Sequence, residues 1–161
     1  MDWGMQNRMS RIFSPKDGRT VMLAVDHGYF LGPVSRLEDL RKSIEPLIPF
    51  ADSLMITRGA LRNCIDAKYN IPIVLRASGG NSVLDEDLSN EGLTVSIEDA
   101  LRLNISAVAL SIYVGTPHQH QTVFDRHADR VTIFQQQFVP LVRLRDLYLA
   151  RRLYVLSPLD P

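Results

Sequence analysis

The residues with the clearest catalytic potential follow an apolar segment near the N-terminus, in the sequence TVMLAVDHGYF (residues 20–30). Asp26 and His27 come directly after the valine-rich run 21–25, where a buried strand would end and a loop would begin. Carboxyl and imidazole groups can both transfer protons to and from a reacting molecule. We therefore predict Asp26 as a catalytic acid or base and His27 as a substrate-binding residue.

Further polar side chains follow the later apolar runs in the same way. Arg58 follows the second run, Arg76 and Ser78 stand at the end of the third, and Tyr113 stands near the end of a fourth. In parallel α/β folds, reactive groups gather on the loops at the carboxyl ends of the strands. Because arginine pairs well with phosphate, we predict the two arginines and the serine as substrate-binding residues.

Each of these residues also has a structural interpretation. Aspartate is common in turns at the ends of strands, and the ring of His27 can hydrogen-bond a neighbouring backbone carbonyl. Arg58 and Arg76 can form salt bridges beneath a loop, which is the preferred interpretation for both. The residue pattern alone leaves the catalytic and the structural interpretation of Asp26 open.

Two other motifs suggest binding sites that we reject. The sequence SGGNS (residues 78–82) could cradle a phosphate with its backbone N–H groups, but it lacks the lysine of a P-loop, so a tight turn is expected. The sequence HQHQ (residues 118–121) has histidines two positions apart, with no third Cys, Asp or Glu ligand nearby. Two such histidines share one side of a strand but not of a helix. No metal site is predicted.

The spacing of apolar residues predicts an α/β fold. The runs indicate four strands at residues 21–25, 52–57, 71–77 and 105–115, separated by helical segments at 35–48, 59–66 and 96–104. Ser35 with Glu38 forms a capping-box pattern for the first helix, and Ser96 is the expected cap of the last. This alternation predicts right-handed crossovers and a parallel sheet with helices outside.

Polar groups from several strand ends that share one face are typical of TIM-barrel sites. A full (β/α)8 barrel takes about 250 residues, whereas this chain has 161. We therefore predict the N-terminal part of a TIM barrel, with about four strands, over residues 1–122. Residues 123–161 contain six arginines and no lysine or glycine. They are predicted to be an unrelated tail, translated out of frame.

Composition argues against several classes of partner. The formal net charge is zero, so nucleic acid is not an expected ligand. No apolar run approaches the roughly 20 residues of a membrane helix, and residues 1–13 lack the apolar core of a signal peptide. Cys64 is the only cysteine and cannot form an intrachain disulfide. A cytoplasmic location and no membrane contact are therefore expected.

Seven motifs together resemble one family. They are DWGMQNRMSRIF, VMLAVDHGYFLGP, LMITRGALR, VLRASGGNS, LSNE, EDALRLN and YVGTPHQHQ, spread over about residues 2–123. They are similar to sequences of the DeoC/FbaB (class I aldolase-like) family of (β/α)8 barrels. The resemblance implies acetyl transfer from a small phosphorylated ketone, a dione of autoinducer-2 breakdown, to coenzyme A, giving glycerone phosphate. It also implies no bound cofactor, coenzyme A as co-substrate, and a cytoplasmic homo-oligomer.

The same resemblance implies a catalytic residue that this chain does not contain. The family forms a Schiff base on a lysine of the sixth strand, and Asp26 matches the acid that assists proton transfer in that pocket. No lysine follows Lys68 in this chain. The favoured interpretation is therefore an inactive copy whose reading frame changes near codon 122. The alternatives are an active thiolase or class I fructose-bisphosphate aldolase, and a non-catalytic half-barrel that binds a partner through its open sheet edges.

Overall fold

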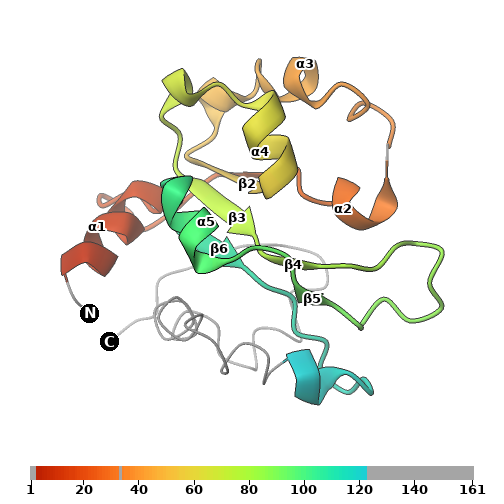
Figure 1. Ribbon diagram of the computed structural model, residues 1–161. Coiled ribbons are helices and arrows are strands. Elements are labelled where there is room, and N and C mark those ends of the chain that lie inside the picture. The colour runs from red at the N-terminus through yellow and green to blue at the C-terminus, as the bar shows by residue number, and fades with distance from the viewer. Residues whose placement is uncertain (1–2, 33, 123–161) are drawn as a thin grey trace.

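The computed structural model describes residues 3–32 and 34–122, and the tail predicted at 123–161 lies outside them. Its centre is a sheet of four parallel strands, in the spatial order β1 (Met22–Ala24), β2 (Ser53–Thr57), β3 (Ile73–Arg76) and β6 (Ala107–Ala109). The strand order follows the chain order, as each helical connection returns the chain to the next position in the sheet (Figure 1). The predicted parallel sheet is confirmed.

Short helices accompany the sheet in the described residues. They are α1 (Trp3–Ile12), α2 (Gly28–Leu31), α3 (Leu40–Ile44), α4 (Arg58–Cys64) and α5 (Ile97–Arg102), with 3-10 turns at Ile48–Phe50 and Ala67–Tyr69. In Figure 1, α3 and α4 lie together on one side of the sheet. None of the helices in these residues combines the length and the hydrophobicity needed to cross a membrane.

The helix-covered face of the sheet forms the main core. Alternate residues of a strand point to opposite faces, and on this face Leu54, Ile56 and Leu75 are fully buried. They belong to one cluster with Ile44 of α3 and Ala100 of α5. Apolar residues of α3 and α5 thus cover this face of the strands.

The opposite face of the sheet has its own smaller cluster. Met55, Val74 and Ala107 of three neighbouring strands are buried together with Ile12, the last residue of α1. In a TIM barrel, one face of the strands packs on the outer helices and the other lines the barrel interior. The face that carries Val74 therefore corresponds to the barrel interior.

The beginning of the predicted helix at 35–48 is wrong. The helix in this region is the shorter α3, and its cap is Asp39, whose side chain accepts a hydrogen bond from the backbone N of Lys42 at 3.3 Å. Arg36 has a φ of +71°, a left-handed conformation that a right-handed helix cannot contain. The capping box predicted at Ser35 therefore does not form.

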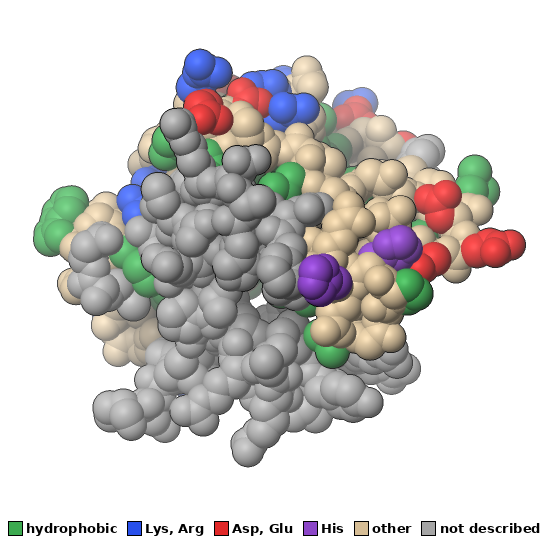
Figure 2. Space-filling model, turned by 60° about the horizontal axis from the view of Figure 1, so that its bottom comes forward, with side chains coloured by type: hydrophobic (Ala, Val, Ile, Leu, Met, Phe, Trp, Pro, Cys, Tyr) green, Lys and Arg blue, Asp and Glu red, His purple; other side chains and the backbone are tan. Residues whose placement is uncertain are grey.

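The loop predicted at residues 78–82 is partly a strand. Ser78 and Gly79 form β4, which pairs antiparallel with β5 (Gly92–Leu93). The intervening residues form a loop that extends away from the sheet (Figure 1). The loop carries three exposed acidic residues, Asp85, Glu86 and Asp87. Figure 2 shows acidic side chains together at the right-hand side of the face it displays. Instead of the expected tight turn, residues 80–91 form a longer loop that connects β4 to β5.

One predicted helix cap is confirmed, and one helix was not predicted. The cap of α5 is confirmed, because the side chain of Ser96 accepts a hydrogen bond from the backbone N of Asp99 at 3.2 Å. Helix α1 has no counterpart among the predicted elements. Met5 and Ile12 are its buried residues, and this spacing of seven residues is too sparse to predict a helix by itself.

We expect the core to depend on the helix-covered face. Leu75→Ala should lower the free energy of unfolding by about 2–5 kcal/mol, because Leu75 is fully buried and its truncation leaves a cavity. The matched control is Leu101→Ala on α5, where the side chain is 63% exposed; its effect should stay within about 0.5 kcal/mol. Urea unfolding measures both changes, and equal losses would contradict this assignment of the core.

Candidate active site

The carboxyl ends of the parallel strands meet at one edge of the sheet, and the polar side chains predicted from the sequence lie there. Asp26 comes two residues after β1, Arg76 is the last residue of β3, and Tyr113 follows β6. Arg76 stands two positions after Val74, so it shares the face that corresponds to the barrel interior. Strand direction and pleat together bring these side chains to one place.

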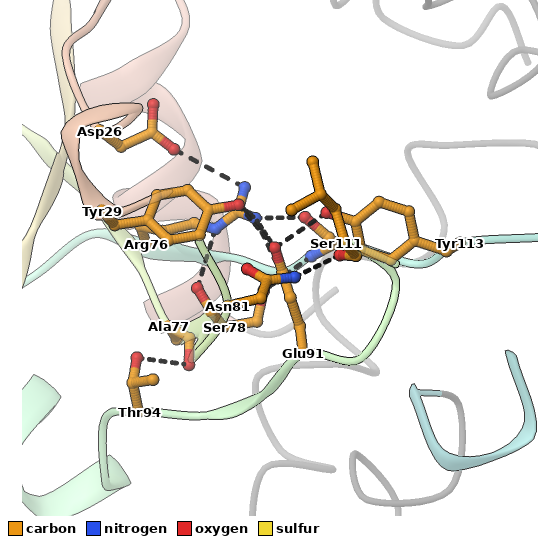
Figure 3. Close-up of polar contacts among 11 residues, drawn as sticks. Asp26, Tyr29, Arg76, Ala77, Ser78, Asn81, Glu91, Thr94, Ser111 and Tyr113 are labelled. Atoms are coloured by element: carbon orange, nitrogen blue, oxygen red, sulfur yellow. Dashed lines mark hydrogen bonds and ion pairs between the residues drawn. The ribbon is translucent and has the colours of Figure 1, made fainter. Parts of the chain in front are cut away.

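A buried ion pair between Arg76 and Glu91 is the centre of the site. The Nη2 atom of Arg76 lies 3.1 Å from both carboxylate oxygens of Glu91. The Glu91 side chain is completely inaccessible to solvent, and that of Arg76 is 11% exposed. Glu91 reaches this position from the end of the loop between β4 and β5 (Figure 3). The pair therefore connects this loop to the end of β3.

Three hydroxyl groups complete the surroundings of the Glu91 carboxylate. Tyr29 and Tyr113 donate hydrogen bonds to its Oε1 at 2.6 and 2.9 Å, and Ser78 donates one to Oε2 at 2.7 Å. Burial acts to raise the pKa of Glu91, but these hydrogen bonds and the charge of Arg76 outweigh it and lower the pKa. Glu91 is therefore ionised at neutral pH.

The guanidinium of Arg76 is held on several sides. Its Nε donates to the backbone oxygen of Ser78 at 3.0 Å, and its Nη2 also donates to the hydroxyls of Tyr29 and Ser111. The Tyr29 ring lies against it, with 4.5 Å between the Arg76 Cζ and the ring centroid, which is a cation–π contact. Arg76 is thus fixed in orientation as well as neutralised.

Asp26 is the second carboxyl group of this cluster, and its surroundings differ from those of Glu91. It is buried, with 6% of its surface exposed, and its Oδ2 lies 3.6 Å from the Nη1 of Arg76 (Figure 3). Burial raises the pKa of Asp26 above its ordinary value, and the charge of Arg76 only partly opposes this shift. Asp26 is therefore the carboxyl of the pair that binds a proton more readily, as a general acid or base requires.

Two other predicted substrate-binding residues, His27 and Arg58, lie near this cluster. His27 is half-buried beside Asp26, at the start of α2, and its side chain makes no capping hydrogen bond to that helix. Arg58 forms a salt bridge of 2.8 Å with Asp99, which also pairs with Arg62 at 2.7 Å. The structural interpretation of Arg58 thus describes the contact it makes, and a role in substrate binding remains a prediction.

An open pocket of about 250 Å³ lies next to the ion pair. Three of the predicted substrate-binding residues line it: Arg58, Arg76 and Ser78. Tyr29 and Gly79 also contribute to its wall. The pocket brings residues of α2, α4, β3 and β4 to one space large enough for a small polar molecule.

Sequence reasoning missed Glu91, Tyr29 and Ser111 as members of the cluster. Glu91 stands in the polar segment 80–91, where no apolar period points to a buried residue. The one signal for it was its presence in the family-like motif LSNE. In the described residues, no three His, Cys, Asp or Glu side chains converge as metal ligands would.

Known structures define the class of fold. An archaeal fructose 1,6-bisphosphate aldolase matches 84% of this chain and 53% of its own, with a TM-score of 0.63 and 23% identity. A fructose-bisphosphate aldolase from Slackia heliotrinireducens matches 76% of this chain and 43% of its own, with a TM-score of 0.60 and 12% identity. The described part of the chain is therefore a partial TIM barrel of the aldolase type, as predicted.

Relatives in sequence are more specific. The 3-hydroxy-5-phosphonooxypentane-2,4-dione thiolase of Yersinia enterocolitica is 58% identical over 123 residues, which are 76% of this chain and 42% of the thiolase. The thiolase of Yersinia pestis is 57% identical over the same length. No family model matches the chain. The predicted resemblance to a class I aldolase-like thiolase is confirmed, and the chain spans about two fifths of the length of these relatives.

Gly79 should be a sensitive position of the site. A Cβ atom there would lie 3.0 Å from Cδ2 and 3.3 Å from Cε2 of the Tyr29 ring, so Gly79→Ala should displace the ring that supports Arg76. We expect a loss of about 1–3 kcal/mol in the free energy of unfolding. Gly59→Ala is the matched control, because nothing lies within 4 Å of its Cβ position; it should be neutral or slightly stabilising. Thermal unfolding of both variants tests this, and equal effects would contradict it.

Asp26 should make folding stability depend on pH in a defined direction. Because its folded-state pKa is raised above the ordinary value of 3.8, the folded chain binds more protons than the unfolded chain between these two pKa values. Stability from this group therefore falls as pH rises from the unfolded through the folded pKa. Asp26→Asn removes the effect, so the variant should gain stability relative to the parent as pH rises from about 4 to 8. Urea unfolding across this range measures the difference, and the opposite slope would refute it.

Proposed function

We propose that this chain supplies the acid–base part of an aldolase-type site that acts on a small phosphorylated ketone, as in the thiolases it resembles. The observation that carries the proposal is the placement of Asp26. It is a buried carboxyl at the carboxyl end of the first strand, with a raised pKa, and it forms an ion pair with Arg76, which lines the pocket together with Arg58.

The acetyl transfer that the family resemblance implies requires one proton to move. When the acetyl group of 3-hydroxy-5-phosphonooxypentane-2,4-dione passes to coenzyme A, a carbon–carbon bond breaks and a carbon–sulfur bond forms. The proton of the thiol must then end on the carbon that loses the acetyl group, which gives glycerone phosphate. A carboxyl with a raised pKa can take up this proton and deliver it, and this is the role we assign to Asp26.

The Schiff-base amine of the family has no counterpart among the lysines of this chain. Lys42 and Lys68 are 85% and 63% exposed and pair with Asp39 and Asp66. The pKa of Lys68 is raised by its hydrogen bond with Asp66, which keeps this amine protonated and non-nucleophilic. Lys16 is exposed in the turn before β1. We therefore propose that this chain alone is inactive in acetyl transfer and in aldol cleavage.

Borohydride trapping tests the inactivity. The chain is incubated with the phosphorylated dione, or with dihydroxyacetone phosphate to cover the aldolase alternative, and then reduced with borohydride. Mass spectrometry should show no substrate-dependent adduct on lysine, because a Schiff base needs an unprotonated amine in a desolvated pocket. A stoichiometric adduct that weakens in Asp26→Ala would show a working enzyme instead.

A chimera tests the acid–base role directly. Residues 1–122 replace the matching part of the Yersinia enterocolitica thiolase, and acetyl-CoA formation is measured. The chimera should be active, and Asp26→Asn should lower its kcat about 10²–10⁴-fold, the range for loss of a general acid or base. The control Asp39→Asn removes a carboxylate that pairs with the exposed Lys42 away from the pocket and should leave kcat nearly unchanged. A folded but inactive chimera would favour the non-catalytic half-barrel.

A further inference from the structure

Two carboxyl groups face a single guanidinium in the interior of this site. Asp26 and Glu91 both contact Arg76. The side chain of Asp26 is 8% exposed, that of Glu91 is 0% exposed and that of Arg76 is 11% exposed. One positive charge can neutralise only one carboxylate, and an uncompensated buried charge is costly. The way in which Arg76 is divided between the two carboxyls therefore determines which of them is free to bind a proton.

The division is strongly unequal. Glu91 receives the Nη2 of Arg76 at 3.1 Å on both oxygens, together with three hydroxyl donors. Asp26 has an ion-pair contact of 3.6 Å with Nη1, which is longer than the 2.7–3.2 Å of a hydrogen bond from nitrogen to oxygen. Arg76 is thus committed to Glu91.

Other contacts prevent Arg76 from turning toward Asp26. Its Nε is bound to the backbone oxygen of Ser78, its Nη2 contacts Ser111, and the Tyr29 ring lies against its plane. Ser78 itself donates to Glu91 and accepts from the backbone N of Ser111 at 2.9 Å. A movement of the guanidinium would break several hydrogen bonds in a buried place, each with a desolvation cost.

We propose that Glu91 is a positioning residue: by binding Arg76 through both of its oxygens it withholds this guanidinium from Asp26, which remains the proton carrier of the site. The inference rests on the proposed function of Asp26. It adds that the loop between β4 and β5, which carries Glu91, sets the protonation of a carboxyl that follows β1.

The groups that face Asp26 all enter this balance. Burial is the largest influence on the pKa of Asp26 and raises it, as does Glu91, whereas Arg76 from β3, the backbone of Asp26 itself and His27 from the start of α2 lower it. The pKa values of Tyr29 and Tyr113 are raised by burial and by their hydrogen bonds to Glu91. Both phenols therefore stay neutral hydrogen-bond donors in the pH range where the carboxyls titrate. Arg76 and Glu91 are the charges that determine the pKa of Asp26.

The unchanged full-length chain gives the first test. Carboxyl carbon NMR during a pH titration should show Asp26 binding its proton at a higher pH than Glu91. The reverse order would overturn the proposal, and this result needs no variant that might fail to fold. Assignment of the two signals comes from their correlation with the backbone.

Two variants of Glu91 then separate its position from its charge. Glu91→Gln frees Arg76, so the midpoint of Asp26 should fall by about one pH unit or more, a tenfold change in proton affinity. Glu91→Asp keeps the charge but is one methylene shorter, so Arg76 is released in part and the midpoint should fall by less, in the same direction. An unchanged midpoint in Glu91→Asp would leave charge alone as the cause and overturn the positioning role.

The controls make the result specific to this pair. Asp99→Asn removes a carboxylate that is also paired with arginine and should leave the Asp26 midpoint within about 0.3 units. If Glu91 were merely structural, its variants would lower the melting temperature without moving the midpoint. If the midpoint shifts as expected but Asp26→Asn leaves the kcat of the chimera unchanged, the proposed function is rejected while the division of Arg76 between Glu91 and Asp26 still stands.

Discussion

The buried ion pair between Arg76 and Glu91 is the interaction on which the rest of the site depends. Taking two charges out of water costs several kcal/mol per ion, and the attraction between them offsets this only when their remaining hydrogen-bonding capacity is also satisfied. Here the carboxylate accepts from Tyr29, Ser78 and Tyr113, and the guanidinium donates to a backbone oxygen and to hydroxyls. The pair is stable in the interior because so many of its neighbours are committed to it.

This commitment has a structural consequence for the surrounding chain. The partners of the pair come from α2, β3, β4, the β4–β5 loop and the segment after β6, so the pair connects segments that the strands alone would leave separate (Figure 3). Gly79 permits the arrangement, because the Tyr29 ring occupies the space that a side chain at this position would need. The packing of the Tyr29 ring at the edge of the sheet and the position of the Arg76 charge therefore depend on each other.

The same edge is where an aldolase-type barrel carries out its chemistry. The partial barrel brings a buried carboxyl with a raised pKa and an arginine-lined pocket to the carboxyl ends of its strands, and the family resemblance implies a lysine on a later strand. An acid–base group and a Schiff-base amine are complementary, because the amine provides the electron sink while the carboxyl moves the proton. In the proposed function this chain carries the first of these two parts.

The sequence by itself determined the order of the strands, their parallel direction and the placement of Asp26, Arg76 and Ser78 at strand ends. Local rules are sufficient for these features, since apolar runs mark buried strands and parallel strands end at one edge. Only the tertiary structure decided that Arg58 pairs with Asp99 and that Glu91 enters the interior. Glu91 stands in a polar loop without any period, and its burial depends on donors that are far from it in the chain, so no local pattern contains that information.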